Sequence, residues 1–100
     1  MTTFAFNTNH IAEENLLRLE EKFFELDKMI QRGRKIQRDI ADAVAKVTAA
    51  PSLTKRERID TLADLANRTI DINKRVRLLK RKADYLDQMI QDFRQISEGV

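Results

Sequence analysis

Cysteine and tryptophan are absent from this sequence of 100 residues, which holds only one proline, one histidine and two glycines. Without cysteine, the chain cannot form a disulfide framework or a thiolate metal site. With so little glycine, and with no phosphate-loop or nucleophile-elbow motif, a nucleotide-binding loop is not expected either. A chain of this length forms one domain at most, so we predict a single domain over residues 1–100.

Long hydrophobic runs are also missing, because uninterrupted apolar stretches reach only two or three residues. A helix that spans a membrane needs about 20 predominantly apolar residues. The first residues lack the charged and apolar regions of a signal peptide. The sequence therefore predicts a cytoplasmic protein with no membrane span, or a viral protein made inside a host cell.

Residue types that support catalysis or metal binding are few. His10 is the only histidine, and with Glu13 and Glu14 it has the spacing of ligands on one helix face. A di-iron bundle would need two Glu-x-x-His units and further inward glutamates, which are missing, so we interpret this group as a solvated helix start. The sequence thus predicts no catalytic residue, no metal site and no cofactor, and favours a protein that is not an enzyme.

The pattern that is present is an apolar residue every three or four positions on both sides of Pro51. Spacings that alternate between three and four residues are the heptad pattern of a left-handed coiled coil. The pattern predicts one helix over 9–48, a turn over 49–53 and a second helix over 54–97. The predicted seam consists of Leu16, Leu19, Phe23, Leu26, Ile30, Gly33, Gln37, Ile40, Val44 and Val47, and of Leu62, Leu65, Thr69, Ile72, Val76, Leu79, Ala83, Leu86, Ile90 and Phe93.

The ends of these helices carry local signals. Phe4 and Phe6 alternate as in an extended segment, which predicts an N-terminal arm over 1–8, either frayed or docked on the core or on a second subunit. At the start of the second helix, Thr54 and Glu57 have the spacing of a capping box.

A short connection makes the two helices antiparallel neighbours, so the fold class is all-α, a long two-helix hairpin of coiled-coil type. Pairs whose residue numbers sum to 102 centre the turn on Pro51 and place Gly33 beside Thr69. We favour this register over one that sums to 109, which needs a longer loop. A glycine inside a helix costs about 1 kcal/mol relative to alanine, which indicates close packing at Gly33.

The chain has more large apolar residues than one seam can use. A hairpin buries a single stripe of each helix, and the surplus predicts a dimer that forms a four-helix bundle, or a different protein that supplies the missing helices. The predicted residues of self-association or partner binding are Leu17, Phe24, Met29, Ile36, Met89 and Ile96.

Basic residues are concentrated in the middle of the chain. Residues 32–82 carry 15 basic and 6 acidic side chains, a net charge of +9, whereas the two ends together carry −6. One interpretation is pairing between the basic run over 73–82 and the acidic half of the first helix. The other is a surface for an acidic partner, nucleic acid included. The candidate patch near the turn consists of Arg32, Arg34, Lys35, Arg38, Lys55, Arg56, Arg58 and Arg68.

Taken together, these patterns predict a non-enzymatic coiled-coil module for protein–protein interaction, such as an adaptor, assembly factor, chaperone-like partner or inhibitor, acting as a homodimer. The alternative hypothesis is a protein that binds duplex nucleic acid through the basic patch. No aromatic residue lies between Phe24 and Tyr85, so single strands would have nothing to stack on.

Overall fold

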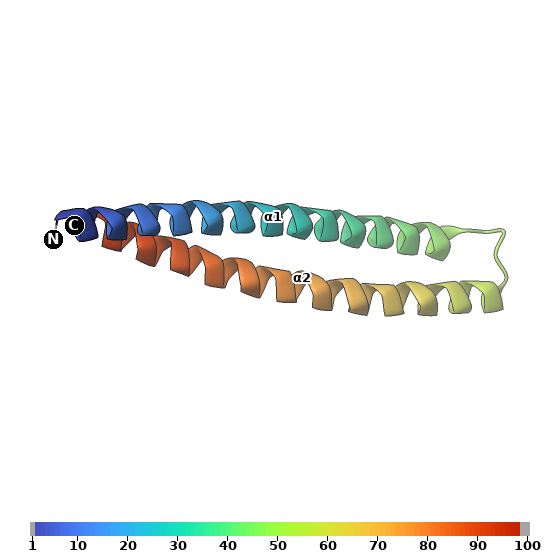
Figure 1. Cartoon of the computed structure of the whole chain (residues 1–100). Helices are drawn as coiled ribbons and strands as arrows, with labels where there is room; N and C mark the ends of the chain where they lie inside the picture. Colours follow the sequence, from blue (N-terminus) through green and yellow to red (C-terminus); the bar gives the residue numbers. More distant parts are fainter. Residues whose placement is uncertain (1, 99–100) are drawn as a thin grey trace. The chain divides into compact units, whose positions relative to one another are not determined.

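A computed structural model describes the backbone of residues 2–98 and the side chains of residues 13–96 and 98. Its two helices are α1 (Thr2–Ala49) and α2 (Lys55–Glu98), joined by one turn over residues 50–54. α1 and α2 run antiparallel, so the fold is the all-α helical hairpin that the sequence predicts (Figure 1).

The predicted N-terminal arm is wrong, because α1 already begins at Thr2. Two alternating phenylalanines are a weak signal for an extended segment, and residues 2–9 contain no glycine or proline that would interrupt a helix. Asn7, Thr8 and Asn9 are of residue types that favour helix N-caps, which gives a second signal for a later helix start. Inside a helix, however, asparagine and threonine cost only about 0.7 kcal/mol or less per residue, so these residues do not stop α1. Their side chains lie outside those that the structure describes.

The turn lies one residue later than the sequence predicts, over 50–54 and not 49–53. α1 ends at Ala49, one residue before the position that Pro51 biases away from helix. At the other end, the backbone amide of Glu57 donates to Thr54 Oγ1 over 3.1 Å, and the Thr54 hydroxyl donates to the Glu57 carboxylate over 3.0 Å. The threonine cap therefore sits one residue before α2, although the glutamate binds the hydroxyl and not the backbone amide of the cap.

The chain divides into two compact units, Met1–Lys28 with Lys80–Val100, and Met29–Leu79. In each unit a stretch of α1 packs against a stretch of α2, and every predicted seam residue is buried or half-buried. The most buried apolar side chains, at 5–9% exposure, are Ile30, Leu65, Ile72, Val76, Ala83 and Ile90. The heptad pattern therefore identified the core correctly.

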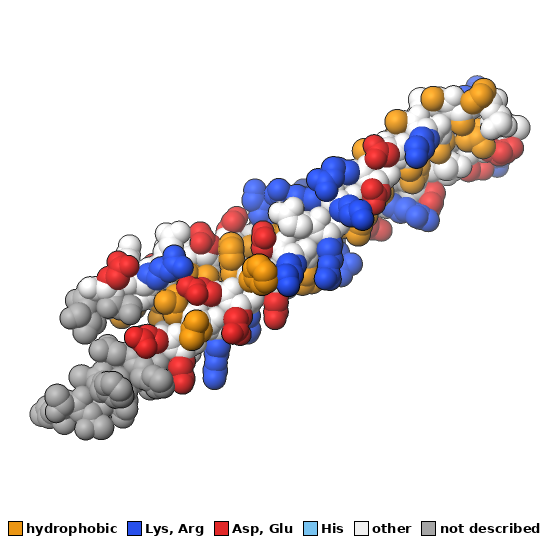
Figure 2. Space-filling model, turned by 90° about the horizontal axis from the view of Figure 1, so that it is seen from above, with side chains coloured by type: hydrophobic (Ala, Val, Ile, Leu, Met, Phe, Trp, Pro, Cys, Tyr) orange, Lys and Arg blue, Asp and Glu red, His pale blue; other side chains and the backbone are white. Residues whose placement is uncertain are grey.

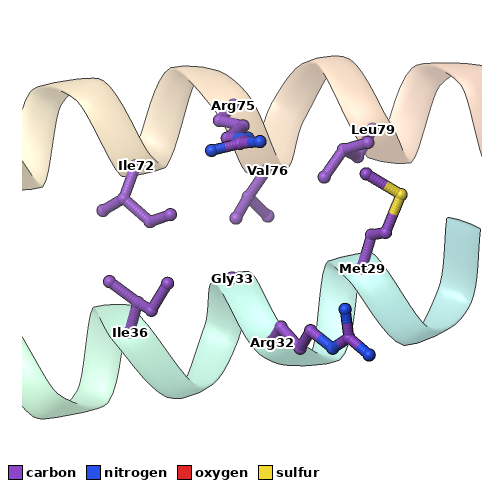
Figure 3. Close-up of a pocket in the computed structure, with 8 residues that line it drawn as sticks. All are labelled: Met29, Arg32, Gly33, Ile36, Ile72, Arg75, Val76 and Leu79. Carbon is purple, nitrogen blue, oxygen red and sulfur yellow. The ribbon is translucent and has the colours of Figure 1, made fainter.

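Gly33 shows which register the 29–79 unit uses. A Cβ atom added to Gly33 would lie 2.6 Å from Val76 Cγ2 and 3.9 Å from Ile72 Cδ1 (Figure 3). Gly33 thus faces Val76 and not Thr69, so the favoured register is wrong and the one that sums to 109 is correct. Gly33 permits this register, because the absence of a Cβ makes room for a branched valine.

Replacing Gly33 with alanine tests this contact. In a free helix the change would stabilise by about 1 kcal/mol, but here the new methyl group overlaps Val76, and overpacking costs about 1–3 kcal/mol. We expect Gly33→Ala to lower the free energy of unfolding by up to about 2 kcal/mol, measured by urea denaturation with circular dichroism.

A double-mutant cycle with Val76→Ala supplies the control. Truncation of Val76 removes the overlapping Cγ2 atom, so the alanine at position 33 should be tolerated far better in that background. If the cycle shows no coupling between the two positions, the close approach does not exist.

Candidate interaction surface

One side of the seam is held by polar cross-links between the helices. In the 29–79 unit, Gln37 Nε2 donates to Asn73 Oδ1 over 2.8 Å. In the other unit, the guanidinium of Arg94 lies 2.9 Å from the carboxylate of Glu20 and donates a hydrogen bond to it. Asn73, Arg94 and Glu20 each directly follow a seam residue in the sequence. We call the side of the 29–79 unit that carries the Gln37–Asn73 hydrogen bond its polar flank.

The opposite flank of the 29–79 unit is an apolar groove of about 190 Å³. Figure 3 shows Val76 pointing toward Gly33 and Met29 pointing toward Leu79. Met29 and Ile36 are 40% and 46% exposed, so the groove is open along its rim. The lining residues are Met29, Arg32, Gly33, Ile36, Ile72, Arg75, Val76 and Leu79.

A second hollow of about 290 Å³ continues this groove along the same helices. It shares Ile36, Ile72 and Arg75 with the first and adds Ile40, Asp71 and Arg68. Apolar side chains form the floor, and guanidinium groups stand at the edge. We call the two hollows together the arginine-edged groove. Its rim consists of Met29, Ile36, Ile40, Arg32, Arg68 and Arg75.

The other predicted contact residues lie on the unit of residues 1–28 and 80–100. Leu17, Phe24 and Ile96 are exposed by about 60% each. Lys28 Nζ lies 4.4 Å from the centroid of the Phe24 ring, a cation–π contact that leaves most of the ring accessible. Met89 differs, because it is half-buried and lines a separate groove with Leu19 and Phe93, among others.

Most of the predicted basic patch is unpaired. Arg32, Arg34, Lys35, Arg38 and Lys55 are exposed and form no ion pair with the residues that the structure describes. Two others have partners four residues away on α2, since Arg56 pairs with Asp60 at 3.7 Å and Arg68 with Asp64 at 3.1 Å. Figure 2 shows Lys and Arg side chains projecting beside exposed hydrophobic ones on one face.

The basic run over 73–82 does not pair with the acidic half of α1. Across the described part of the chain, no ion pair joins this run to α1. The expected pairing depended on the register that sums to 102, which is wrong for the 29–79 unit. The positive charge of the run is therefore available to other groups.

Arg58 is the patch residue whose role the sequence did not predict. Its guanidinium donates to the backbone oxygen of Ala50 over 2.7 Å, and the side chain is half-buried. It thus links the start of α2 to the end of α1 across the turn, and it does not belong to a free basic surface. Its position four residues before Leu62 continues the heptad seam, a signal that would have revealed this inward orientation.

The described residues contain neither a metal-binding cluster nor a membrane-spanning helix. No three histidine, cysteine, aspartate or glutamate side chains gather into a metal-binding group among the described residues. The side chain of His10 lies outside that set, so its grouping with Glu13 and Glu14 is not described. Within the same part of the chain, neither helix is long and apolar enough to cross a membrane.

Comparison of the sequence with protein-family models, with curated proteins and with solved structures finds no match.

Substitution of Arg58 tests whether its hydrogen bond to Ala50 stabilises the fold more than the exposed ion pair of Arg56 does. A part-buried, charge-assisted hydrogen bond contributes about 1.5–3 kcal/mol, whereas an exposed ion pair contributes about 1 kcal/mol or less. We expect Arg58→Ala to lower the free energy of unfolding by about 2 kcal/mol, and the matched control Arg56→Ala by less than about 0.5 kcal/mol. Urea denaturation of both variants measures this difference, and equal losses would contradict the assignment.

Proposed function

We propose that this chain is a non-enzymatic coiled-coil interaction module that acts as a homodimer, through apolar side chains that the hairpin leaves uncovered. The observation that supports the proposal most directly is the number of large hydrophobic residues that stay exposed. They are Leu17, Phe24, Met29, Ile36, Ile59, Ile70, Leu78, Tyr85 and Ile96, at 40–69% exposure.

The core is thin by comparison. Among the described residues, no side chain is fully buried, and the six most buried ones include an alanine. Two helices can cover only one stripe of each other, whereas four helices in a bundle cover wider apolar faces. Fully burying a large apolar side chain stabilises by about 1.5–3 kcal/mol, so each half-exposed one offers about 1 kcal/mol to a partner.

A second copy of the chain is the simplest partner that supplies two more helices. In a twofold dimer the same patches are used by both subunits, so every exposed apolar group counts twice. As a dimer, the chain would serve as an adaptor, an assembly factor, a chaperone-like partner or an inhibitor, with its remaining surface free for a second protein.

Mutation of Phe24 tests the dimer. An aspartate there would place a charge in the buried interface of both subunits, so we expect Phe24→Asp to weaken association roughly 100-fold, about 1.4 kcal/mol per subunit. Sedimentation equilibrium measures the mass of each variant. The control is Gln31→Asp, an exposed position one heptad further along α1, which should keep the wild-type mass. A wild-type protein that is monomeric at 100 μM, about the concentration range where weak dimers form, would overturn the proposal.

A second candidate function is binding to duplex nucleic acid through its phosphates. It is favoured by the exposed cations that lack ion pairs, and by the charge of the 29–79 unit, which carries 12 basic and 6 acidic side chains, a net +6. Arg34, Lys35 and Arg38 fall on one exposed stretch of α1. Contacts of this kind recognise the phosphate backbone and carry no sequence information.

This candidate predicts a steep dependence on salt. We expect a fluorescent 25-base-pair duplex (about two helical turns) to bind at 50 mM salt and to lose roughly 10- to 1,000-fold in affinity at 200 mM, because each phosphate contact releases counterions. Arg34→Glu with Arg38→Glu should abolish binding without loss of helicity. The control is Arg18→Glu, an exposed arginine in the acidic stretch of α1. Equal binding by both variants would contradict the phosphate surface.

A further inference from the structure

The edges of the arginine-edged groove are positively charged and incompletely paired. Arg32 and Arg75 line it without an ion pair to any described residue, and Arg68 pairs with Asp64 on its own helix. Asp71 is the one carboxylate among the residues that line the two hollows. The groove therefore suits an apolar helix face whose flanking residues are acidic.

The same chain carries a face of that kind at residues 13–28. Leu17 and Phe24, seven residues apart, are both about 60% exposed. Glu13 and Glu21 are exposed and lie on the same face of α1, because they precede or follow Leu17 by four residues. We call these four residues the acidic stripe. Residues 13–28 carry six acidic and three basic side chains, a net charge of −3.

The groove and the stripe match in spacing as well as in charge. On the groove, Met29 and Ile36 are the exposed apolar residues of α1, and they are also seven residues apart. A separation of seven residues corresponds to about 10.5 Å along a helix. Apolar groups at this repeat interdigitate between neighbouring helices in coiled coils. A charged residue lies between the two apolar residues in both cases. It is the acidic Glu21 in the stripe and the basic Arg32 in the groove.

We infer that the occupant of the arginine-edged groove is the acidic stripe of a second copy of this chain. The inference rests on the proposed dimer and specifies which surfaces meet in it. Under twofold symmetry each subunit gives its stripe to the partner's groove and receives the partner's stripe in return. Both surfaces are then used within one dimer. If the stripe of one subunit bound the groove of another without the reverse contact, one stripe and one groove would stay free. Further subunits could then bind to them and extend the assembly into an open filament.

Charge reversal tests this pairing in the full-length chain. The groove-reversed variant carries Arg32→Glu and Arg75→Glu, and the stripe-reversed variant carries Glu13→Lys and Glu21→Lys. Alone, each variant juxtaposes like charges at both contacts, so we expect each to dimerise at least about 10-fold more weakly than wild type. Mixed in equal amounts, the two variants have complementary charges at both contacts and should form a heterodimer near wild-type affinity.

A matched control distinguishes this pairing from general electrostatics. The double variant Arg34→Glu with Lys74→Glu reverses two positive charges, as the groove-reversed variant does, but neither residue lines the groove. It should change the dimerisation constant by less than about 3-fold. Sedimentation equilibrium on each variant, on the mixture and on wild type gives all the constants.

The outcomes separate the two proposals. A monomeric wild type overturns the dimer and this inference together. A dimeric wild type with groove-reversed and stripe-reversed variants that dimerise normally, or with a mixture that stays monomeric, overturns the inference alone. In that case the groove would fit an acidic helix of another protein. Recovery of the dimer only in the mixture supports stripe-in-groove pairing between two copies.

Discussion

The close approach of α2 to Gly33 decides much of what the rest of the 29–79 unit can do. Because Gly33 lacks a Cβ, Val76 fits against the backbone of α1, and this contact fixes the register of the two helices. That register brings Gln37 to Asn73, where two neutral amides satisfy each other across the coil. Among the described residues, no ion pair joins the basic run over 73–82 to α1, so the charges of the run are not neutralised by that helix. The floor of the arginine-edged groove is the same glycine and valine. A single small residue therefore links the packing of the coil to the surface that it exposes.

The two flanks of the seam have become chemically different. On the polar flank of the 29–79 unit, Gln37 and Asn73 connect the helices directly, and a partner would have to break this hydrogen bond to enter. On the other flank, the side chains of Met29 and Ile36 cover the seam only partly. Arginine at the edge does not close a groove, because its long side chain keeps the guanidinium in water while its methylene groups lie on apolar surface. An occupant would gain both apolar contact and charge pairing there, so the open flank is where we propose that a second copy binds.

The heptad spacing was sufficient to predict two helices and their seam, and the capping-box spacing of Thr54 and Glu57 predicted the threonine cap, because these features depend on residues close in sequence. It could not distinguish two registers one heptad apart, since both pair the same classes of seam position. The two registers differ in whether Gly33 faces Thr69 or Val76. That choice depends on the volumes of the facing side chains, and the spacing of apolar residues carries no information about those volumes. For the N-terminal residues, the alternation of Phe4 and Phe6 was given too much weight against a helix that nothing interrupts. For the candidate surface, the apolar residues were predicted as one set, whereas the structure distributes them over a groove, a stripe and the half-buried Met89.

The two candidate functions draw on different cations, so they need not compete. Arg32 and Arg75 line the groove and would be neutralised by the acidic stripe of a second copy. Arg34, Lys35 and Arg38 do not line it, and Lys55 lies beside the turn. Dimerisation through the groove would therefore leave these four positive charges on each subunit exposed to solvent. Bringing two such subunits together doubles the number of cations on one particle, which strengthens the attraction of a polyanion. Assembly and phosphate binding, if both occur, would thus reinforce each other: the groove determines the dimer, and the remaining cations determine what the dimer attracts.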